Sequence, residues 1–490
     1  MLFSRTGMER AMLFSRALAS FAGALLVAAC AGLRETVPVP ASVPVSAMAA
    51  FEGPTQAMNG YWRSNGYGLL MGIDGKNLTF HNLTGEVCIP FTEDDSSFVD
   101  FVDAYRLDEA QRILHVGASL EQHTYQFLRE DGLPDRCLTP PPNTPEGNFA
   151  AFESFMGAHY AFFDLYGVDW NARVEAARGG LRHEMTETEL FDLFSSMLAG
   201  INDAHLTLVG EIGGERRVYD PVQGPTEGAV IRQGAAAGLT SREAKRAMRK
   251  AVWEEGIPQD VLNGAGTVAG NGRIHYGLAA KDVGYFAMYT VGGYSEAGFD
   301  DPLADIEIVN SALDAALNEF IAAGVGAVIV DASQNHGGYD FISREIASRF
   351  AASPVNIYDK RPADAERPYH TQLVLTPSDR VRFTGPVYLL TTDITVSGGE
   401  TLTLSMKPLA NVIQVGTTTR GALSDILEKR LPNGWMLGLS NEIYADANGA
   451  VWEGRGIAPE VLIDVFPVDD INGGHAKAIA ELVRLFKSKP

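Results

Sequence analysis

The chain has 490 residues, of which 46% are hydrophobic and 20% are charged, so it is long enough for two to four domains with a sizeable buried core. Its formal net charge is −22. Proteins that bind nucleic acid present basic surface to the phosphates, so this charge argues against a nucleic-acid partner.

Residues 1–29 have the pattern of a bacterial targeting signal. Arg5, Arg10 and Arg16 precede an apolar stretch that is too short to span a bilayer. That stretch runs into Val-Ala-Ala-Cys, which ends at Cys30 and resembles a lipobox. The resemblance implies cleavage before Cys30, lipidation of this cysteine, and an exported protein anchored to the bacterial membrane on the periplasmic side. The alternative is an ordinary secretory signal with an incidental cysteine.

A tether and a small β module are expected next. Residues 30–57 are rich in Pro, Ala, Val and Ser, which is typical of a tether. Residues 58–138 contain short strand-like runs separated by Gly, Asn and Asp, which predicts a small antiparallel β module. Cys88 and Cys137 both lie in it, and an exported chain can oxidise them to a disulfide. Two buried free thiols are the alternative.

Residues 139–209 are predicted to form a helical subdomain. Apolar residues recur at helical spacing over residues 149–163. A second helix is expected to start at Thr186, because Glu189 three positions later completes a capping box. His205 follows the end of this helix in a polar, loop-like context.

Residues 210–282 are expected to form an irregular and partly helical insert. Residues 241–255 have the pattern of a basic amphipathic helix, which we interpret as a solvated face rather than a binding site. The insert has neither the room nor the glycine pattern of a peptide-binding PDZ module.

Strands and helices alternate over residues 283–490, which predicts an α/β domain. The apolar run at residues 327–330 indicates a strand buried on both faces, as in a parallel sheet. We expect strands at 283–289, 327–330, 386–390 and 412–415, and helices at 306–321, 339–350 and 398–406.

Ser397 is the candidate nucleophile. It lies in Thr-Val-Ser-Gly-Gly-Glu, where a predicted strand turns into a predicted helix. Backbone N–H groups at a helix N-terminus can hold the oxyanion of an acyl-transfer intermediate. A serine also needs a base. Lys407 lies ten residues further along the same helix, about 15 Å away, so of the ten histidines His205 is the better candidate.

Four segments in this order resemble the tail-specific (C-terminal processing) protease family: 203–206, 330–338, 395–400 and 452–460. The similarity covers about residues 145–466. It implies an α/β catalytic core of the crotonase or Clp-protease-like spiral type, preceded by the helical subdomain and the β module. It also implies a serine endopeptidase that acts on peptide or protein substrates without a cofactor.

The branch of that family decides the base. In the Ser–Lys branch a lysine follows the serine by 25 residues, where this chain has Ala422. The sequence instead resembles the tricorn-like and retinoid-binding branch, which implies Ser–His catalysis through an acyl-enzyme, with His205 as base and Glu453 as its acidic partner. That branch places a serine directly before its histidine, whereas this chain has Ala204. Glu453 therefore acts through water or another residue, or is structural; Lys429 is the fallback base.

The glycines after the strand at 327–330 are candidates for the oxyanion hole. We expect one N–H from Gly337 or Gly338 to act together with the N–H of Gly398, because glycine lets the backbone approach a substrate carbonyl. A plain strand-to-helix turn is the alternative. Asp331 and Glu400 are expected to be structural, and no metal is expected because the cysteines and histidines lack ligand spacing.

Two other functions are compatible with the sequence. One is a non-catalytic ligand- or peptide-binding protein on the same fold, since the retinoid-binding relatives are not chiefly proteases. The other gives the β module the main role, as a recruiter of a partner or cell-wall component. The serine, the histidine and the glycine pair favour catalysis.

Overall fold

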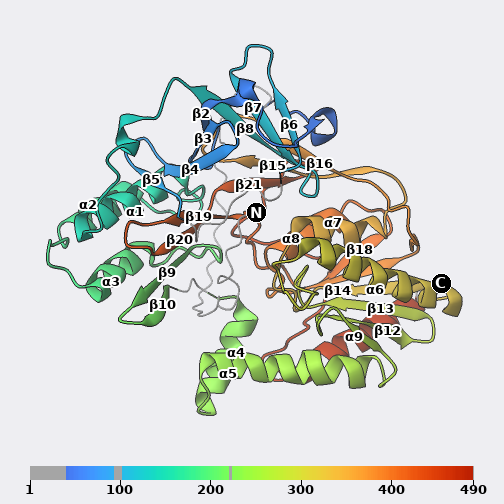
Figure 1. Ribbon diagram of the computed structural model, residues 1–490. Helices are drawn as coiled ribbons and strands as arrows, with labels where there is room; N and C mark the ends of the chain where they lie inside the picture. The colour runs from blue at the N-terminus through green and yellow to red at the C-terminus, as the bar shows by residue number, and fades with distance from the viewer. Residues whose placement is uncertain (1–39, 93–101, 220–222, 489–490) are drawn as a thin grey trace, which may run out of the picture.

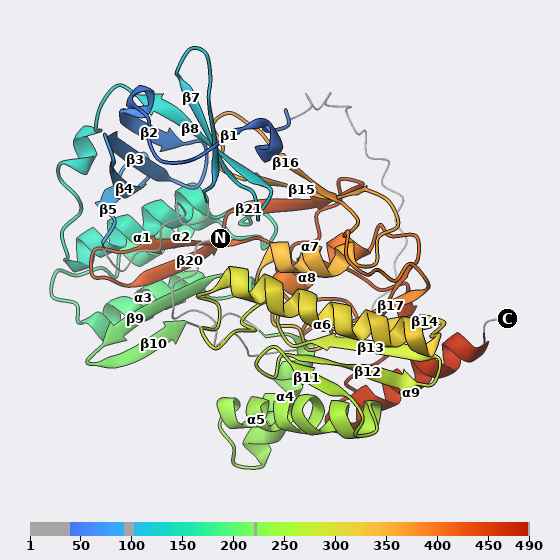
Figure 2. The same ribbon diagram turned by 45° about the vertical axis from the view of Figure 1, so that its right-hand side comes forward.

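The computed structural model describes residues 40–92, 102–219 and 223–488. The predicted targeting signal and Cys30 lie outside these residues. The fold is mixed α/β with four sheets, which confirms the predicted fold class. Figures 1 and 2 show an N-terminal β sheet above a helical region on one side and a layered α/β region on the other. Within the described ranges, no helix combines the length and apolar character needed to cross a membrane.

The α/β region is built on a seven-stranded sheet with the order β11-β12-β13-β14-β17-β18-β22. Strands β13, β14, β17, β18 and β22 run parallel to one another, whereas β12 pairs antiparallel with both β11 and β13. The carboxyl ends of the parallel strands therefore lie at one edge of the sheet. The bounds are β11 Thr267–Ala269, β12 Ile274–Ala280, β13 Val283–Met288, β14 Ala327–Asp331, β17 Val387–Thr391, β18 Val412–Gly416 and β22 Val461–Leu462.

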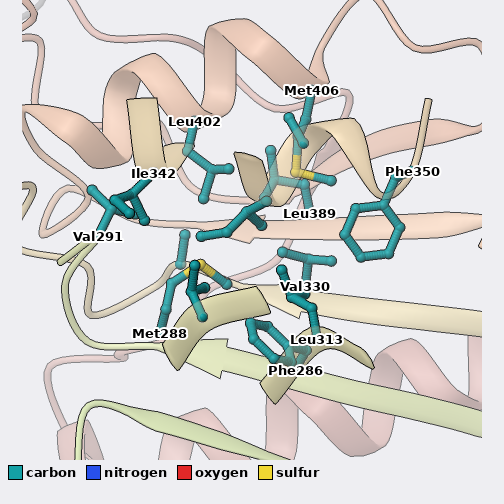
Figure 3. Packing of buried hydrophobic residues seen from close by; sticks show 14 of the residues in the cluster. Phe286, Met288, Val291, Leu313, Val330, Ile342, Phe350, Leu389, Leu402 and Met406 are labelled. Carbon is teal, nitrogen blue, oxygen red and sulfur yellow. The ribbon is translucent and has the colours of Figure 1, made fainter. Parts of the chain in front are cut away.

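Helices cover both faces of this sheet, which explains why its central strands are continuous apolar runs. Alternate strand residues such as Val330 and Leu389 face α6, α7 and α8 (Figure 3). The residues between them, such as Ile329 and Leu390, face α4, α5, η5 and α9. The bounds are α4 Pro225–Ala236, α5 Ser241–Met248, the π-helix η5 Arg249–Val261, α6 Pro302–Ala323, α7 Asp340–Ser348, α8 Gly398–Met406 and α9 Ile471–Ser488. The helix expected at 241–255 is thus α5 and the first half of η5.

The N-terminal sheet has eight antiparallel strands in the order β1-β6-β7-β8-β2-β3-β4-β5. Cys88 at its edge is bonded to Cys137. The bounds are β1 Ala49–Ala50, β2 Gly60–Ser64, β3 Leu69–Asp74, β4 Asn77–Leu83, β5 Cys88–Pro90, β6 Ala104–Leu107, β7 Ile113–Ala118 and β8 His123–Glu130.

A four-stranded sheet combines strands from both halves of the chain. Its order is β10-β9-β20-β19, and all its pairs are antiparallel. Phe194, Trp435 and Leu437 share one core with helices α1–α3, so residues 426–440 pack with the region that carries His205 and not with the rest of 283–490. The bounds are α1 Pro145–His159, α2 Trp170–Arg178, α3 Glu187–Leu198, β9 Thr207–Ile212, β10 Glu215–Tyr219, β19 Ile426–Arg430 and β20 Met436–Ser440.

A three-stranded sheet, in the order β16-β15-β21, lies between the N-terminal sheet and helices α7 and α8 (Figure 2). Its bounds are β15 Val355–Pro362, β16 Thr371–Leu375 and β21 Glu442–Asp446.

Candidate active site

Ser397 lies at the carboxyl-end edge of the large sheet, between β17 and α8. It has φ 57° and ψ −123°, a conformation that is rare and strained for a residue with a side chain. Its N–H donates to the carbonyl of Ala422 at 2.9 Å. The side chain is partly exposed. The sharp turn thus presents the hydroxyl at the sheet edge, directly before a helix N-terminus.

Two backbone N–H groups beside Ser397 donate no hydrogen bond to any described residue: those of Gly338 and Gly398. A Cβ added to Gly398 would lie 2.9 Å from the Gly338 nitrogen, and one added to Gly337 would lie 2.5 Å from Cβ of Ser397. The two loops therefore meet where only glycine fits. The third predicted glycine differs, because the N–H of Gly337 is taken up by Oδ1 of Asn335 at 2.9 Å.

Asn335 fixes this glycine loop to the end of β13. Its side chain is fully buried, and its Nδ2 donates to the carbonyl of Met288 at 3.1 Å. The carbonyl of Gly337 accepts the N–H of Val291 at 2.9 Å. The free N–H of Gly338 is held in place by these contacts and not by the turn alone. Sequence reasoning did not single out Asn335, although it lies within the quoted motif.

His205 is buried, with 5% of its surface exposed. Its backbone N–H donates to Oδ1 of Asp203 at 2.8 Å, and its ring hydrogen-bonds to the backbone of Ser424, whereas Nδ1 has no partner. Burial lowers the pKa of His205, and Arg420 lowers it further; Asp203, Asp425 and the Ser424 bond oppose this. The balance favours the neutral imidazole that a general base requires.

One segment, residues 421–425, joins the serine and the histidine. Ser397 donates to the carbonyl of Ala422, and the ring of His205 binds the backbone of Ser424. Within the part of the chain that the structure describes, no hydrogen bond joins the Ser397 hydroxyl to the His205 ring. Catalytic hydrogen bonds are often long in the absence of substrate, so this geometry is compatible with a catalytic Ser–His pair.

Glu453 holds that segment and does not contact the ring of His205. Its Oε2 accepts the N–H groups of Leu423 at 2.9 Å and Ser424 at 3.1 Å, and its Oε1 has no partner. Burial, and then the nearby Asp203, raise the pKa of Glu453 well above its usual range. Glu453 therefore positions the segment through backbone hydrogen bonds, and its environment disfavours the ionised carboxylate.

Glu400 holds the same segment from the other side. Its Oε1 accepts the N–H groups of Gly421 and Ala422, which ties the first turn of α8 to the segment. Burial raises the pKa of Glu400 to about 7. Its contacts match the structural role expected from the sequence. Asp331 is structural as well: it accepts hydrogen bonds from Tyr285, Ser333 and His475.

Lys429, the fallback base, is fully buried and has partners away from Ser397. Its Nζ donates to the carbonyls of Tyr67 at 2.7 Å and Gly68 at 3.0 Å, and to Oδ1 of Asn82 at 3.0 Å. It therefore links β19 to the N-terminal sheet and does not serve Ser397.

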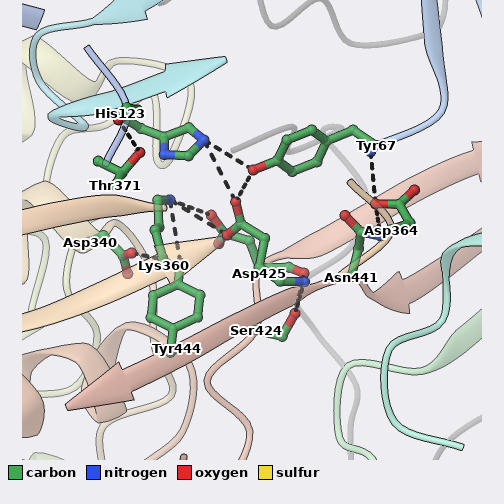
Figure 4. A network of polar contacts seen from close by, with 12 residues as sticks. Tyr67, His123, Asp340, Lys360, Asp364, Thr371, Ser424, Asp425, Asn441 and Tyr444 are labelled. Carbon is green, nitrogen blue, oxygen red and sulfur yellow. Dashed lines mark hydrogen bonds and ion pairs between the residues drawn. The ribbon is translucent and has the colours of Figure 1, made fainter. Parts of the chain in front are cut away.

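A buried polar network reaches the segment from the N-terminal sheet (Figure 4). Nζ of Lys360 lies 3.7 Å from Oδ2 of Asp425 and 3.5 Å from Oε2 of Glu442. Oε1 of Glu442 in turn accepts a hydrogen bond from the hydroxyl of Tyr67 at 2.6 Å. Burial opposes the ionisation of Asp425, but Lys360 holds its pKa below the usual value. An ionised aspartate thus adjoins the residue whose backbone binds His205.

No cluster of three or more His, Cys, Asp or Glu residues in the described ranges is arranged to hold a metal ion. Of the predicted residues, the structure brings Ser397, Gly338 and Gly398 together, and His205 and Glu453 each hydrogen-bond to the neighbouring segment 421–425. Sequence reasoning missed the role of Asp203, whose signal was its place two residues before His205.

The chain is similar in sequence and in fold to known proteins. The profile of peptidase family S41 matches residues 282–463. A solved structure of a candidate peptidase from Parabacteroides merdae is similar, with 24% identity, a TM-score of 0.55, and coverage of 71% of this chain and 98% of that one. Mature CPAF has 13% identity, a TM-score of 0.48 and coverage of 70% and 97%. The photosystem II D1 C-terminal processing protease has 13% identity, a TM-score of 0.40 and coverage of 67% and 96%. No curated protein matches the sequence.

Proposed function

Because the chain carries a peptidase family S41 domain at residues 282–463, we propose that it is a serine endopeptidase with Ser397 as nucleophile and His205 as base. The observation that supports this best is the pair of free N–H groups, from Gly338 and Gly398, beside a strained serine at a helix N-terminus. Such preorganised donors stabilise the oxyanion of a tetrahedral intermediate.

The proposed reaction has two halves. Neutral His205 takes the hydroxyl proton as Oγ of Ser397 attacks the peptide carbonyl, and the N–H groups of Gly338 and Gly398 hold the oxyanion. The C–N bond then breaks, the amine leaves with the proton from His205, and an acyl-enzyme remains. Water, deprotonated by His205, attacks the ester carbonyl and releases the acid, which restores the serine.

The proposal requires the imidazole to reach the serine when substrate binds. The backbone N–H of Ser397 and the ring of His205 are both hydrogen-bonded to residues 421–425. A small change in the conformation of this segment would therefore change the distance between the serine and the imidazole. Glu400 accepts the N–H of Gly421 near the start of this segment, and Glu453 accepts the N–H of Leu423 further along it. We assign them to positioning and not to proton transfer.

Export and lipid anchoring are part of the proposal, on the strength of the basic, apolar and Val-Ala-Ala-Cys pattern that ends at Cys30. The substrates would then be periplasmic peptides or proteins. A Cys30→Ser variant should fail to incorporate labelled lipid and should leave the membrane fraction or stay uncleaved. Lipid labelling that persists in this variant would contradict the anchor without touching the peptidase proposal.

A fluorophosphonate probe tests the catalytic assignment. The wild type should be labelled, and peptide mapping should find the probe on Ser397. Ser397→Ala should abolish labelling and peptide cleavage, and His205→Ala should reduce both by roughly a thousandfold or more. The double variant should lose little more than either single one. Ser196→Ala and His183→Ala, which change exposed residues, serve as matched controls. Absence of labelling in folded wild type would favour a binding protein on this fold.

A further inference from the structure

A group of cations lies at the same sheet edge as Ser397. Arg273 directly precedes β12, Arg249 begins η5, and Lys245 lies one turn earlier in α5. Together with the proposed function, on which this inference rests, their position points to a substrate subsite. We propose that Arg249 and Arg273, supported by Lys245, bind an acidic side chain of the peptide substrate.

A short chain of contacts leads from these cations to the oxyanion loop. The carbonyl of Arg273 accepts the N–H of Tyr289 at 2.9 Å, and the carbonyl of Tyr289 accepts the N–H of His336 at 2.9 Å. The rings of Tyr289 and His336 lie 4.7 Å apart. Gly337 and Gly338 come next in the sequence. The cationic group is thus separated from the proposed oxyanion hole by one pair of aromatic rings.

Both guanidinium groups are positioned by packing. Cζ of Arg249 lies 4.7 Å from the centroid of the Tyr289 ring, a cation–π contact. Nη1 of Arg273 lies 3.5 Å from Oγ1 of Thr290, and its Cζ lies 5.7 Å from the centroid of the Phe299 ring. Nε of Arg273 is buried and has no hydrogen-bond partner. These groups are held at the edge with donor capacity left for a carboxylate.

Nearby carboxyl groups, Asp305 beside Arg273 among them, offset this charge only in part. Glu254 pairs with Arg249 at 3.2 Å, but the two side chains are 52% and 39% exposed, and such pairs are weak. Burial raises the pKa of Glu227 to about 8, so this neighbour of Lys245 is mostly neutral at pH 7. Asp305 is buried and accepts the N–H groups of three consecutive residues, Gly293 to Ser295. The edge is locally positive on a chain whose net charge is −22.

The sheet fixes the reach of the subsite. Ser397 follows β17, and Arg273 directly precedes β12, three strands away across β14 and β13. Neighbouring strands lie about 4.8 Å apart, so the span is roughly 14 Å, or about four residues of extended peptide. The acidic residue should therefore lie about three to five residues from the scissile bond. The basic face predicted for residues 241–255 is then part of the active site and not merely solvated.

Binding to an inactive enzyme tests this without catalysis. The assay titrates fluorescent peptides into the Ser397→Ala enzyme. Each peptide carries a single Glu at one of the second to sixth positions on either side of a cleavage site, and a matched peptide carries Gln at the same position. We expect Glu at about the fourth position on one side to bind roughly threefold to tenfold more tightly than Gln. The difference should shrink at high salt. It should vanish in Ser397→Ala with Arg249→Gln and Arg273→Gln, and persist with the control Arg246→Gln on the exposed face of α5.

The outcomes separate this inference from the proposed function. Equal binding of the Glu and Gln peptides would overturn the subsite even if fluorophosphonate labels Ser397. A Glu preference without labelling would support the subsite and reject the peptidase. A preference that disappears when the peptide C-terminus is amidated would assign the cations to a terminal carboxylate and overturn the acidic side chain. Lys245→Gln, which leaves the Tyr289 packing intact, should weaken the preference if the double arginine variant does not fold.

Discussion

Asp203 hydrogen-bonds to the backbone of His205 and not to its ring. Its Oδ1 accepts the backbone N–H of His205 at 2.8 Å, and its Oδ2 accepts a hydrogen bond from the hydroxyl of Tyr160 at 2.9 Å. It is also the carboxylate that most opposes the lowering of the pKa of His205 by burial. Glu453, the acidic partner expected from the sequence, is instead bonded to the N–H groups of Leu423 and Ser424. The charge that supports an imidazolium therefore comes from the residue two positions before the histidine.

Asp203→Asn should consequently lower kcat/KM more than Glu453→Gln. The first change removes a charge beside His205, and we expect a loss on the order of a hundredfold. The second replaces a carboxyl whose pKa is raised well above its usual range by burial with an amide of similar shape, and we expect a loss below about tenfold. Peptide cleavage measured at pH 7.5 with both folded variants decides the order. The reverse order would return the role of partner to Glu453.

The pH dependence of kcat/KM should follow His205. Burial and Arg420 lower its pKa, so the neutral base persists below pH 6.5 and the rate should fall only at lower pH. Arg420→Gln removes a cation that lowers this pKa, so the acidic limb should move to higher pH. Rate profiles of the two enzymes between pH 4.5 and 8 provide the measurement. A limb that stays in place, or moves to lower pH, would show that another group controls the rate.

Asn335→Ala should reduce kcat with little change in KM. The amide fixes the N–H of Gly337 and the carbonyl of Met288, and its loss lets the loop that carries the Gly338 N–H relax. We expect a decrease on the order of tenfold to a hundredfold. Asn148→Ala, which removes a buried amide away from the nucleophile, is the control. Unchanged kcat in folded Asn335→Ala would mean that the loop needs no such anchor.

Lys429→Met should impair stability and spare catalysis. The change leaves two backbone carbonyls and the Asn82 oxygen without the ammonium that binds them, so the free energy of unfolding should fall by about 3 kcal/mol. Urea unfolding gives this value, and activity per folded molecule should remain within about twofold of wild type. A Lys429→Met variant that is as stable as wild type but inactive would indicate that Lys429, and not His205, is the base.

Glu227→Gln should stabilise the protein more at pH 8 than at pH 4.5. Burial raises the pKa of Glu227 from 4.5 to about 8, so between these values the carboxyl ionises in the unfolded chain before it does so in the folded one. The wild type therefore loses stability as the pH rises through this window, and glutamine does not. Urea unfolding at both pH values measures the difference, with the exposed Glu255→Gln as control. A gain independent of pH would contradict the shift.

Local patterns predicted strands β13, β14, β17 and β18 of the large sheet, but not β22, nor β11 and β12, which lie in the stretch expected to be an irregular and partly helical insert. The apolar run at 327–330 became β14, Ala327–Asp331, and the helix expected at 398–406 is α8, Gly398–Met406. These features depend on neighbours in sequence: burial on both faces leaves an apolar run, and a strand–turn–helix needs only a few residues around Ser397.

The environment of His205 depends on residues far away in the sequence, so it could not be predicted. Ser424 binds its ring, and Glu453 and Lys360 position that segment through contacts of buried polar groups. Polar contacts of this kind leave no periodicity in the sequence. The resemblance to a known family predicted that Glu453 is the acidic partner of His205. Only the three-dimensional structure shows that Glu453 accepts backbone N–H groups instead.

The pairing of β9 with β20 has a consequence for how the protein is made. The hairpin that follows His205 completes its sheet only with Met436–Gly438, more than two hundred residues later in the chain. A ribosome must therefore release most of the chain before the half-site with the histidine can close over its apolar core. Nascent chains truncated before this strand should keep His205 accessible to chemical modification. During synthesis the serine segment and the histidine segment can therefore be fixed relative to one another only after β20 has emerged.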